Sequence, residues 1–364
     1  MDQGITNLMY IVDLPPPVHG MSVINEKYIN ALPASAVINS APSFLYKKSR
    51  SFYWYFFKFL IVISIFFKIL KARMAGDKIC YRSINGGRGQ ILDVLIILFC
   101  RLFNIKLYIQ HHSFAYLNCY SNLFRFLCFV AGKSANHIVL GRAMKLGLIE
   151  TYSIDSSNIL IISNSIFFQT DNLEVSANRN SKVVLGHMAN LTLEKGVGTF
   201  IDLCIELRTQ GFEFNAVLAG PISGKGVSEK ISEFSAISGF KYLGPLYGKA
   251  KEKFFSSLDF FIFPSTYINE AEPLVLYEAT EYGAVIIVTD VGCLADVASS
   301  LGGYSFSVDK KLLINLVTSV GPLLTKYNPE IKSVVKLNLS NHRKLSLSIF
   351  DKLHKEISNE TRSS

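Results

Sequence analysis

Short apolar runs of β-forming residues alternate with helical segments along this chain of 364 residues, and that alternation most constrains the fold. Continuous apolar strands separated by helices are typical of parallel sheets covered by helices on both faces. The predicted strands fall into two groups. The first half contains 8–12, 78–81, 106–110, 137–140 and 159–162, and the second half contains 183–188, 214–220, a short strand near 242, 260–263 and 285–289. The sequence therefore predicts an α/β protein with two successive domains and a ligand cleft between them.

A polar stretch rich in Asn, Asp and Ser separates the two groups of strands. We interpret residues 167–182 as a linker between a first domain, 1–166, and a second domain, 183–329. Residues 330–364 are expected to form a helical C-terminal segment. The six cysteines show no close pair, and they are expected to be buried thiols in a reducing compartment. The N-terminus shows no secretory signal pattern, so a cytoplasmic location is predicted.

Positive charge is concentrated in the first half of the chain. Residues 1–180 contain 18 Lys and Arg against 9 Asp and Glu, whereas residues 181–364 contain 19 of each. This asymmetry indicates that the first half meets an anionic surface or acceptor. Nucleic acid is not the expected partner, because the sequence shows neither an RNA-binding signature nor a helix-turn-helix pattern.

The segment 52–70 is the most apolar part of the chain, and lysine and arginine flank it on both sides. Aromatic and aliphatic residues bordered by basic ones are typical of a helix that lies in a membrane interface. A buried helix of the first domain explains the composition equally well. A transmembrane span is less favoured, because Lys58 leaves an uninterrupted apolar stretch that is short for a bilayer.

Two carboxylates lie close together in the sequence around a predicted helix start in the second half. Glu270 precedes the helix, Pro273 opens it, and Glu278 belongs to its second turn. The free backbone N–H groups of a helix N-terminus attract anions such as phosphates. The stretch 264–279 therefore predicts a site for an anionic ligand that carries hydroxyl groups.

Other candidate residues follow predicted strands, where ligands bind in open α/β sheets. Gly20 lies in the first strand-to-helix loop, which is either a ligand loop or an ordinary connection. His111 and His112 end the strand 106–110, and they are either site residues or merely exposed. Lys195 follows the first strand of the second domain, where it is either a ligand-binding cation or a solvated loop lysine.

The order of these motifs resembles family 4 glycosyltransferases, the large retaining group with the GT-B fold. The resemblance covers nearly the whole chain and is carried by four motifs, which are Pro17-x-x-Gly20, Asn164, Lys195-Gly196 and Glu270-x7-Glu278. It implies two Rossmann-like domains that face each other across a cleft. The C-terminal one would bind a nucleotide-sugar and the N-terminal one the acceptor, in an enzyme of the hexosyltransferase class.

The resemblance also implies a role for individual residues. Glu278 would hold the ribose hydroxyls of the donor, and Glu270 those of the transferred sugar. The backbone N–H groups of Leu274 and Val275 would receive the diphosphate, and Lys195 would neutralise it.

Further roles follow from the same resemblance. His111, or His112 beside it, would lie near the reacting sugar. Asn164 would belong to the donor site, and Gly20 to a loop for the acceptor or a phosphate. No metal and no cofactor other than the nucleotide-sugar, such as a UDP- or GDP-sugar, is expected.

One position departs from the family pattern. The family carries an arginine five residues before the lysine, and this chain has Asn190 there. An asparagine donates a hydrogen bond to a phosphate but supplies no charge. Either a neighbour such as Lys225 compensates, or the donor is bound more weakly.

The expected activity is sugar transfer to a polyprenyl-diphosphate-linked or growing glycan in the synthesis of a bacterial surface polysaccharide, such as O-antigen, capsule or exopolysaccharide. The enzyme would be retaining, metal-independent and peripheral on the inner face of the anionic plasma membrane. Two alternatives stay open: a sugar-nucleotide epimerase on the same fold, and a non-catalytic subunit of a glycan assembly complex.

Overall fold

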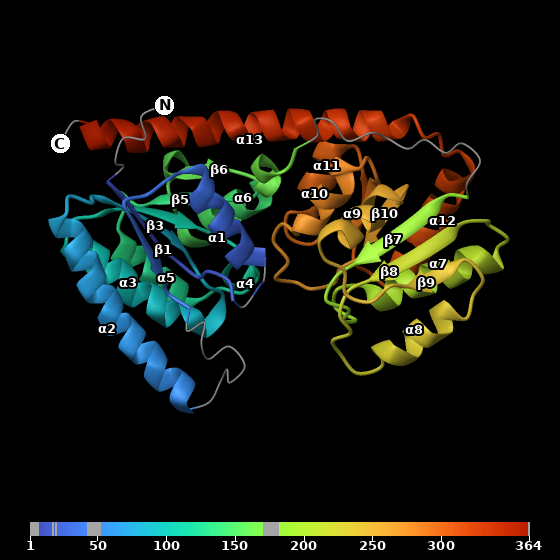
Figure 1. Cartoon of the computed structure of the whole chain (residues 1–364), viewed down its shortest axis with the longest axis horizontal. Coiled ribbons are helices and arrows are strands. Elements are labelled where there is room, and N and C mark those ends of the chain that lie inside the picture. The colour runs from blue at the N-terminus through green and yellow to red at the C-terminus, as the bar shows by residue number, and fades with distance from the viewer. Residues whose placement is uncertain (1–6, 17, 19, 42–51, 170–181, 363–364) are drawn as a thin grey trace. The chain divides into compact units, whose positions relative to one another are not determined.

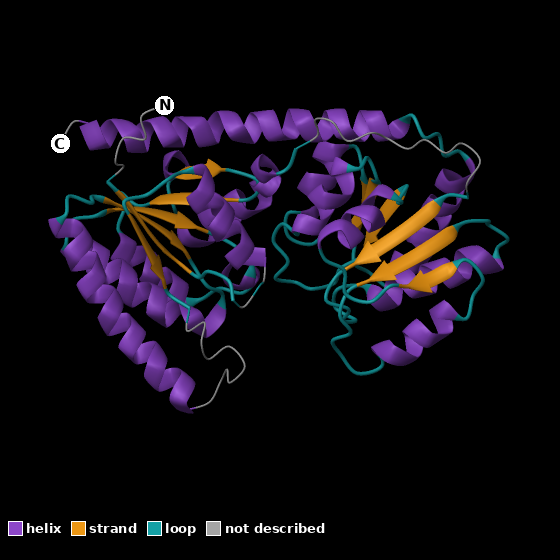
Figure 2. Cartoon of the chain, viewed as in Figure 1, coloured by secondary structure: helices purple, strands orange, loops and turns teal. Residues whose placement is uncertain are grey.

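A computed structural model describes residues 7–16, 18, 20–41, 52–169 and 182–362 of the chain. Figure 1 labels its helices and strands. Residues group into two compact units, one formed by residues 1–167 together with 346–364 and the other by residues 168–345. Each unit contains its own parallel sheet (Figure 2).

The sheet of the first unit has six strands in the order β2-β1-β3-β4-β5-β6, and all neighbours are parallel. Its strands are β1 Leu8–Val12, β2 Ala36–Asn39, β3 Ile79–Ser83, β4 Lys106–Gln110, β5 Asn136–Val139 and β6 Ile159–Ile161. β1 and β3 are buried along their whole length, as strands of a two-sided parallel sheet are expected to be.

Helices connect the strands of the first unit, as right-handed crossovers between parallel strands require. They are α1 Gly20–Ala31, α2 Phe52–Met74, α3 Gln90–Leu102, α4 Ala115–Asn118, α5 Asn122–Ala131 and α6 Arg142–Tyr152, with short 3-10 turns at Gly87–Gly89, Ser156–Asn158 and Asn164–Phe167.

The second unit repeats this plan with the strand order β12-β11-β10-β7-β8-β9, again with parallel neighbours throughout. Its strands are β7 Val184–Met188, β8 Asn215–Ala219, β9 Phe240–Tyr242, β10 Phe260–Phe263, β11 Val285–Thr289 and β12 Tyr304–Phe306. Its helices are α7 Val197–Thr209, α8 Val227–Ser235, α9 Gly248–Ser256, α10 Leu274–Glu281, α11 Leu294–Leu301 and α12 Leu312–Thr325. The last helix, α13 Ile331–Arg362, begins in this unit and ends in the first.

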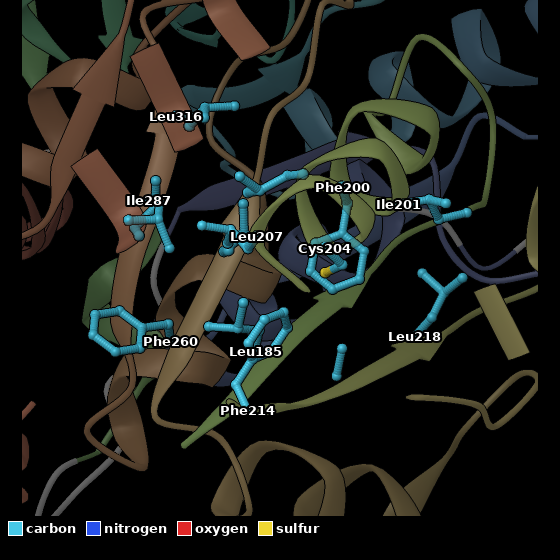
Figure 3. Packing of buried hydrophobic residues seen from close by; sticks show 14 of the residues in the cluster. Leu185, Phe200, Ile201, Cys204, Leu207, Phe214, Leu218, Phe260, Ile287 and Leu316 are labelled. Atoms are coloured by element: carbon cyan, nitrogen blue, oxygen red, sulfur yellow. The ribbon is translucent and has the colours of Figure 1, made fainter. Parts of the chain in front are cut away.

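A large apolar core holds the second unit together. Side chains from β7, β8, β10 and β11 meet those of α7 and α12, as Figure 3 shows for Leu185, Leu207, Phe260 and Leu316. At about 25 cal/mol per Å² of buried apolar surface, a core of this kind is the main term that offsets the entropy of ordering the chain.

The strand order creates a switch point in the second unit. The chain leaves β7 toward β8, and β10 then pairs with the opposite edge of β7. The loops that follow β7 and β10 therefore leave adjacent strand ends in diverging directions, and ligands of open α/β sheets bind at such points.

The predicted α/β fold is confirmed, and each predicted strand corresponds to an observed one. The sequence did not predict β2, β12, α4, α11 or α12. Much of the predicted linker, residues 170–181, lies outside the described residues. The segment 330–364, expected to be helical, contains the single helix α13.

Two further expectations are settled by the structure. The expectation that all six cysteines are buried is wrong, because Cys119 is exposed and Cys128 is half-buried. Cys119 lies in the connection between α4 and α5, and such connections run over the surface. Among the described helices, none is both long and apolar enough to cross a membrane.

Candidate active site

Two loops at adjacent strand ends of the second unit bring Lys195 and Glu270 together. Lys195 belongs to the loop after β7, and its Nζ lies 2.6 Å from Oε2 of Glu270, in the loop after β10. The hydroxyl of the fully buried Ser265 donates to the same carboxylate oxygen at 3.2 Å. The Glu270 side chain is only 9% exposed, so its charge needs these two partners. Lys195 is therefore not the solvated loop lysine that the sequence allowed as an alternative.

The loop that carries Lys195 is fixed against the loop after β10. The backbone N–H of Thr266 donates to the carbonyl of Glu194 at 2.8 Å. Gly196 has φ +86°, and a Cβ there would lie 2.3 Å from the carbonyl oxygen of Pro264. Only glycine tolerates both conditions, so this residue permits the close approach that positions Lys195.

A second glycine fixes Glu270 from the other side. Gly292, in the loop after β11, has φ +60°, and a Cβ there would lie 1.9 Å from the carbonyl oxygen of Glu270. The N–H of Cys293 donates to the carbonyl of Ala271 at 3.2 Å. The loops after β7 and β11 thus hold the loop that carries Glu270. No single sequence motif contains this arrangement, because it involves three separate loops.

Helix α10 begins directly beyond Glu270. Pro273 is its N-cap, with extended backbone and no side-chain hydrogen bond to the helix end. The first helical residues, Leu274 and Val275, are half-buried. Their backbone N–H groups belong to the first turn, where an α-helix offers donors without intrahelical partners.

Glu278 lies in the second turn of α10 and forms its own ion pair. Nζ of Lys251, on α9, lies 2.5 Å from Oε1 of Glu278. The other carboxylate oxygen, Oε2, is buried and has no hydrogen-bond partner among the described residues. That oxygen has unused capacity to accept a hydrogen bond, which suits a ligand hydroxyl. Lys251 was missed in the sequence, because Lys249, Lys251 and Lys253 alternate along α9 and only packing selects one.

The electrostatics of this site are balanced by two neighbouring cation–carboxylate pairs. The ring of Tyr267 lies 4.8 Å from Nζ of Lys195 and stabilises the ammonium further. Ammonium groups and the α10 N-terminus suit an anion, and carboxylates suit hydroxyls. In the described part of the chain, no group of three His, Cys, Asp or Glu side chains is arranged to hold a metal ion.

Asn190 and Lys225 lie on two loops that are joined. The N–H of Leu191 donates to the carbonyl of Pro221 at 2.9 Å, and the N–H of Ser223 donates back to Leu191 at 3.0 Å. Asn190 and Lys225 are both exposed on these loops. The two loops are therefore joined, and it stays a prediction that Lys225 supplies the positive charge that Asn190 lacks.

The histidine pair of the first unit separates into a buried and a half-exposed member. Nδ1 of His111 lies 2.8 Å from Oη of Tyr116, and Nε2 lies 3.0 Å from Nδ1 of His137. Burial lowers the pKa of His111 well below its usual value and that of His137 to about 4, so both rings are neutral near pH 7. Both nitrogens of His111 are thus engaged inside the unit, and only His112 of the pair is partly exposed.

Asn164 and Gly20 lie elsewhere in the first unit. Asn164 is buried at the start of the 3-10 turn after β6. Gly20 begins α1, and a Cβ there would meet no atom within 4 Å. Sterically, position 20 therefore accepts a side chain, so packing does not explain the glycine.

Comparison with solved structures defines the class of fold. HepE from Anabaena in complex with UDP superposes with a TM-score of 0.67 at 15% identity, covering 97% of this chain and 99% of that one. A glycosyltransferase from Rickettsia africae gives 0.66 at 15% identity, over 96% and 98% of the two chains. The apo form of the lipopolysaccharide outer core galactosyltransferase WaaB gives 0.65 at 15% identity, over 95% and 99%. With the two Rossmann-like sheets and the C-terminal helix, these likenesses establish the GT-B fold.

A family match then specifies the activity class. Residues 168–320 match the family described as glycosyl transferases group 1. This range contains both ion pairs and helix α10. The chain is therefore a glycosyltransferase whose second unit carries the group 1 domain. A search of curated protein sequences finds no match.

Proposed function

We propose that the protein transfers a sugar, with retention of anomeric configuration, from a nucleoside-diphosphate sugar to a lipid-linked or growing glycan. The observation that carries this proposal is the Lys195–Glu270 pair beside the N-terminus of α10. It combines a cation and backbone donors for a diphosphate with a buried carboxylate for sugar hydroxyls. UDP in the HepE complex supports a nucleotide-sugar as the donor class.

The chemistry follows from the charge that develops as the donor reacts. The bond between the anomeric carbon and the diphosphate oxygen breaks, and the acceptor oxygen bonds to that carbon on the same face. Negative charge grows on the leaving diphosphate, where the Lys195 ammonium and the N–H groups of Leu274 and Val275 stabilise it. The acceptor proton passes to a diphosphate oxygen, so no strong protein base is needed.

Hydroxyl recognition is assigned to the two carboxylates. Glu270 accepts from the sugar, and the unpartnered Oε2 of Glu278 accepts from the ribose. Lys195 and the α10 N-terminus supply the positive field at the diphosphate, so we propose that transfer proceeds without a divalent metal. In the first unit, the half-exposed His112 is the member of the histidine pair that would reach the reacting sugar.

We assign the acceptor to bacterial surface polysaccharide synthesis, at the inner face of the plasma membrane. The excess of basic residues in the first half supports an anionic, membrane-bound acceptor such as a polyprenyl-diphosphate-linked glycan. The name of the neighbour WaaB, a lipopolysaccharide outer core galactosyltransferase, supports the same direction.

The test is release of nucleoside diphosphate from a panel of nucleotide-sugars, with and without polyprenyl-diphosphate glycans. We expect acceptor-dependent release that continues in EDTA, and NMR of the product should show the anomeric configuration of the donor. Epimerised donor formed without acceptor would support the epimerase alternative, which the family match disfavours. Donor binding without turnover on any acceptor would support the non-catalytic alternative.

A further inference from the structure

We propose that the outer face of helices α2, α3 and α5 is a docking surface for an anionic lipid bilayer. This inference rests on the proposed function, because a lipid-linked acceptor requires the enzyme to meet a membrane. It identifies the elements that make the contact and the side chains that enter the bilayer. We call this surface the three-helix face.

Helix α2 is apolar on two opposite sides. Val62, Ile65, Ile69 and Ala72 recur at helical spacing and are buried against the unit. Leu60, Ile63, Phe67 and Met74 recur at similar spacing and are exposed. A helix that is apolar all round is typical of a buried or membrane-associated element, and here one apolar side is left uncovered.

The neighbouring helices continue the exposed apolar side. On α3 the exposed residues Ile91, Leu95, Leu98 and Leu102 follow the spacing i, i+4, i+7, i+11, which places them on one stripe. On α5 the rings of Phe126 and Phe129 are exposed, with centroids 6.4 Å apart.

Packing between the helices makes these stripes neighbours. The ring of Phe66 on α2 lies 4.9 Å from that of Phe99 on α3, and Nε of Arg73 donates to the carbonyl of Phe103 at 3.0 Å. Helix α3 packs in turn against α5. Figure 1 shows the three helices on one side of the first unit's sheet. Ten large apolar side chains are thus exposed on three helices that pack side by side, and contiguous exposed apolar patches usually mark interaction sites.

The exposed charges on this face have one sign. Helices α2 and α5 contain no Asp or Glu, and the single acidic residue of α3, Asp93, is buried in an ion pair with Arg82. The exposed charged residues include Lys68, Lys71, Arg101 and Arg125. Apolar side chains among cations complement an anionic membrane interface, which takes up both.

A cationic cavity borders the same face at the C-terminal end of α3. It has a volume of about 280 Å³ and is lined by Lys78, Arg101 and Lys106, with Asn104 and Ser134 among the polar residues. Glu356 neutralises Lys106 at 2.8 Å. Arg101 directly precedes the exposed Leu102, so a cation suited to a lipid phosphate and an exposed apolar side chain occur together at this end of α3.

The charge pattern also argues against a second copy of the chain as the occupant. Two identical faces would juxtapose cations with no exposed acid from the three helices to pair with them, which is unfavourable in an isologous interface. An anionic bilayer supplies the missing negative charge.

Vesicle flotation tests the proposal with the full-length protein. We expect it to float with phosphatidylglycerol-containing vesicles at low salt, and to bind vesicles of pure phosphatidylcholine at least tenfold more weakly. The triple variant Phe67→Ser, Leu102→Ser and Phe129→Ser removes side chains that are 61%, 67% and 81% exposed, and it should lose at least tenfold in vesicle affinity. Replacing Lys68 and Lys71 by Gln should cost about fivefold per charge.

The matched control is Ile314→Ser on α12, whose side chain is 64% exposed in the second unit. It should bind vesicles like the unchanged protein, and all variants should keep its thermal unfolding curve. No flotation of the unchanged protein, equal flotation with neutral vesicles, or equal loss in Ile314→Ser would each overturn the proposal. The proposal would also be overturned if the unchanged protein self-associates without binding vesicles and the triple variant abolishes that self-association.

Turnover of a water-soluble acceptor analogue separates this inference from the proposed function. The triple variant should keep that turnover while losing flotation. Flotation of the unchanged protein without turnover on any acceptor would contradict the proposed function but would still support the three-helix face as a membrane-docking surface.

Discussion

The ammonium of Lys195 lies 2.6 Å from the carboxylate of Glu270, so the groups proposed to bind the diphosphate and the sugar of the donor neutralise each other. A diphosphate that draws the ammonium away leaves a carboxylate that is 9% exposed and short of a cation. Sugar hydroxyls then become its natural hydrogen-bond donors. Binding of the diphosphate and binding of the sugar are therefore expected to be coupled through this one contact.

Replacement of Lys195 by Met should lower kcat by roughly 10² to 10³, because it removes one donor to the leaving group. Glu270→Gln should also lower kcat, and the double variant should lose less than the product of the single losses, since the residues are in contact. Steady-state rates measure all three. The control is Lys230→Met, which breaks the ion pair between Lys230 on α8 and Asp202 on α7 and should leave kcat unchanged. If the loss in kcat of the double variant equals the product of the two single losses, the contact does not couple the two residues.

Glu278→Gln should raise the KM for the nucleotide-sugar about tenfold with little change in kcat, because a ribose contact binds ground and transition states equally. Lys251→Met breaks the same ion pair but keeps the carboxylate, so its effect on KM should be smaller. Calorimetric titration with UDP gives the same comparison without turnover. A larger loss in Lys251→Met than in Glu278→Gln would assign the diphosphate to Lys251.

Gly292→Ala should lower kcat/KM at least tenfold, because its Cβ would lie 1.9 Å from the carbonyl oxygen of Glu270 and must displace it. Gly211→Ala is the matched control, with φ +88° and no atom within 4 Å of its Cβ. The control should lose about 1 kcal/mol of stability from the left-handed backbone alone and keep its activity. Unfolding curves and rates separate the two effects. An active Gly292→Ala protein would contradict the proposed positioning of Glu270.

Asn190→Arg should tighten UDP binding about tenfold, because a guanidinium adds charge and a bidentate donor where asparagine has neither. Lys225→Gln should weaken binding if Lys225 supplies the missing charge. Asn190→Gln keeps the amide and serves as the control. Calorimetric titration at two salt concentrations measures the gain, which should shrink at high salt. An unchanged affinity in Asn190→Arg would place this position away from the phosphates.

The stability of the second unit should fall with acid through His187. Its Nδ1–H donates to the carbonyl of Ile262 at 2.8 Å, its ring stacks with those of Phe200 and Phe263, and burial lowers its pKa to about 4. The unfolded chain titrates near its ordinary pKa of about 6.5, so the unfolded state binds the proton first. This contribution is fully present above about pH 6.5 and is lost toward pH 4, at most about 3 kcal/mol.

Denaturation curves across that pH range test this expectation. His187→Gln keeps a donor for Ile262 and should show a shallower loss of stability between pH 6.5 and 4.5. His354→Gln, at a half-exposed position of α13, is the control. If the free energy of unfolding falls equally with acid in the His187→Gln variant and the unchanged protein, His187 does not cause the pH dependence.

The central strands of the second unit, β10 and β11, were predictable because they bury both faces. Phe260–Phe263 has no polar residue, and its bounds were predicted without error. Helix α12 was not predicted. Gly321 and Pro322 lie in its C-terminal half, and both residues disfavour a helix in the sequence. Tertiary packing nevertheless maintains the helix. β12 is only three residues long and gives too short a pattern to detect.

The sequence suggested most of the candidate residues, whose roles stay predictions, but it did not suggest their pairing. Lys195 and Glu270 are 75 positions apart, and only the strand order places their loops side by side. The same limit applies to His111: its position at a strand end was correct, whereas its hydrogen bond to His137 depends on pairing between β4 and β5. Contacts across strands need the register, which local patterns do not contain.

Helix α13 makes the first unit depend on residues that follow the whole second unit in the chain. Phe350, Leu353 and Ile357 are buried, the ring of Phe350 lies 5.7 Å from that of Tyr28, and Glu356 accepts a hydrogen bond from Tyr108 at 3.0 Å. Until α13 has been translated, the N-terminal unit therefore lacks part of its interior, even though its own sheet was translated first. The usual order of co-translational folding, N-terminal domain before C-terminal domain, is reversed here in its final step.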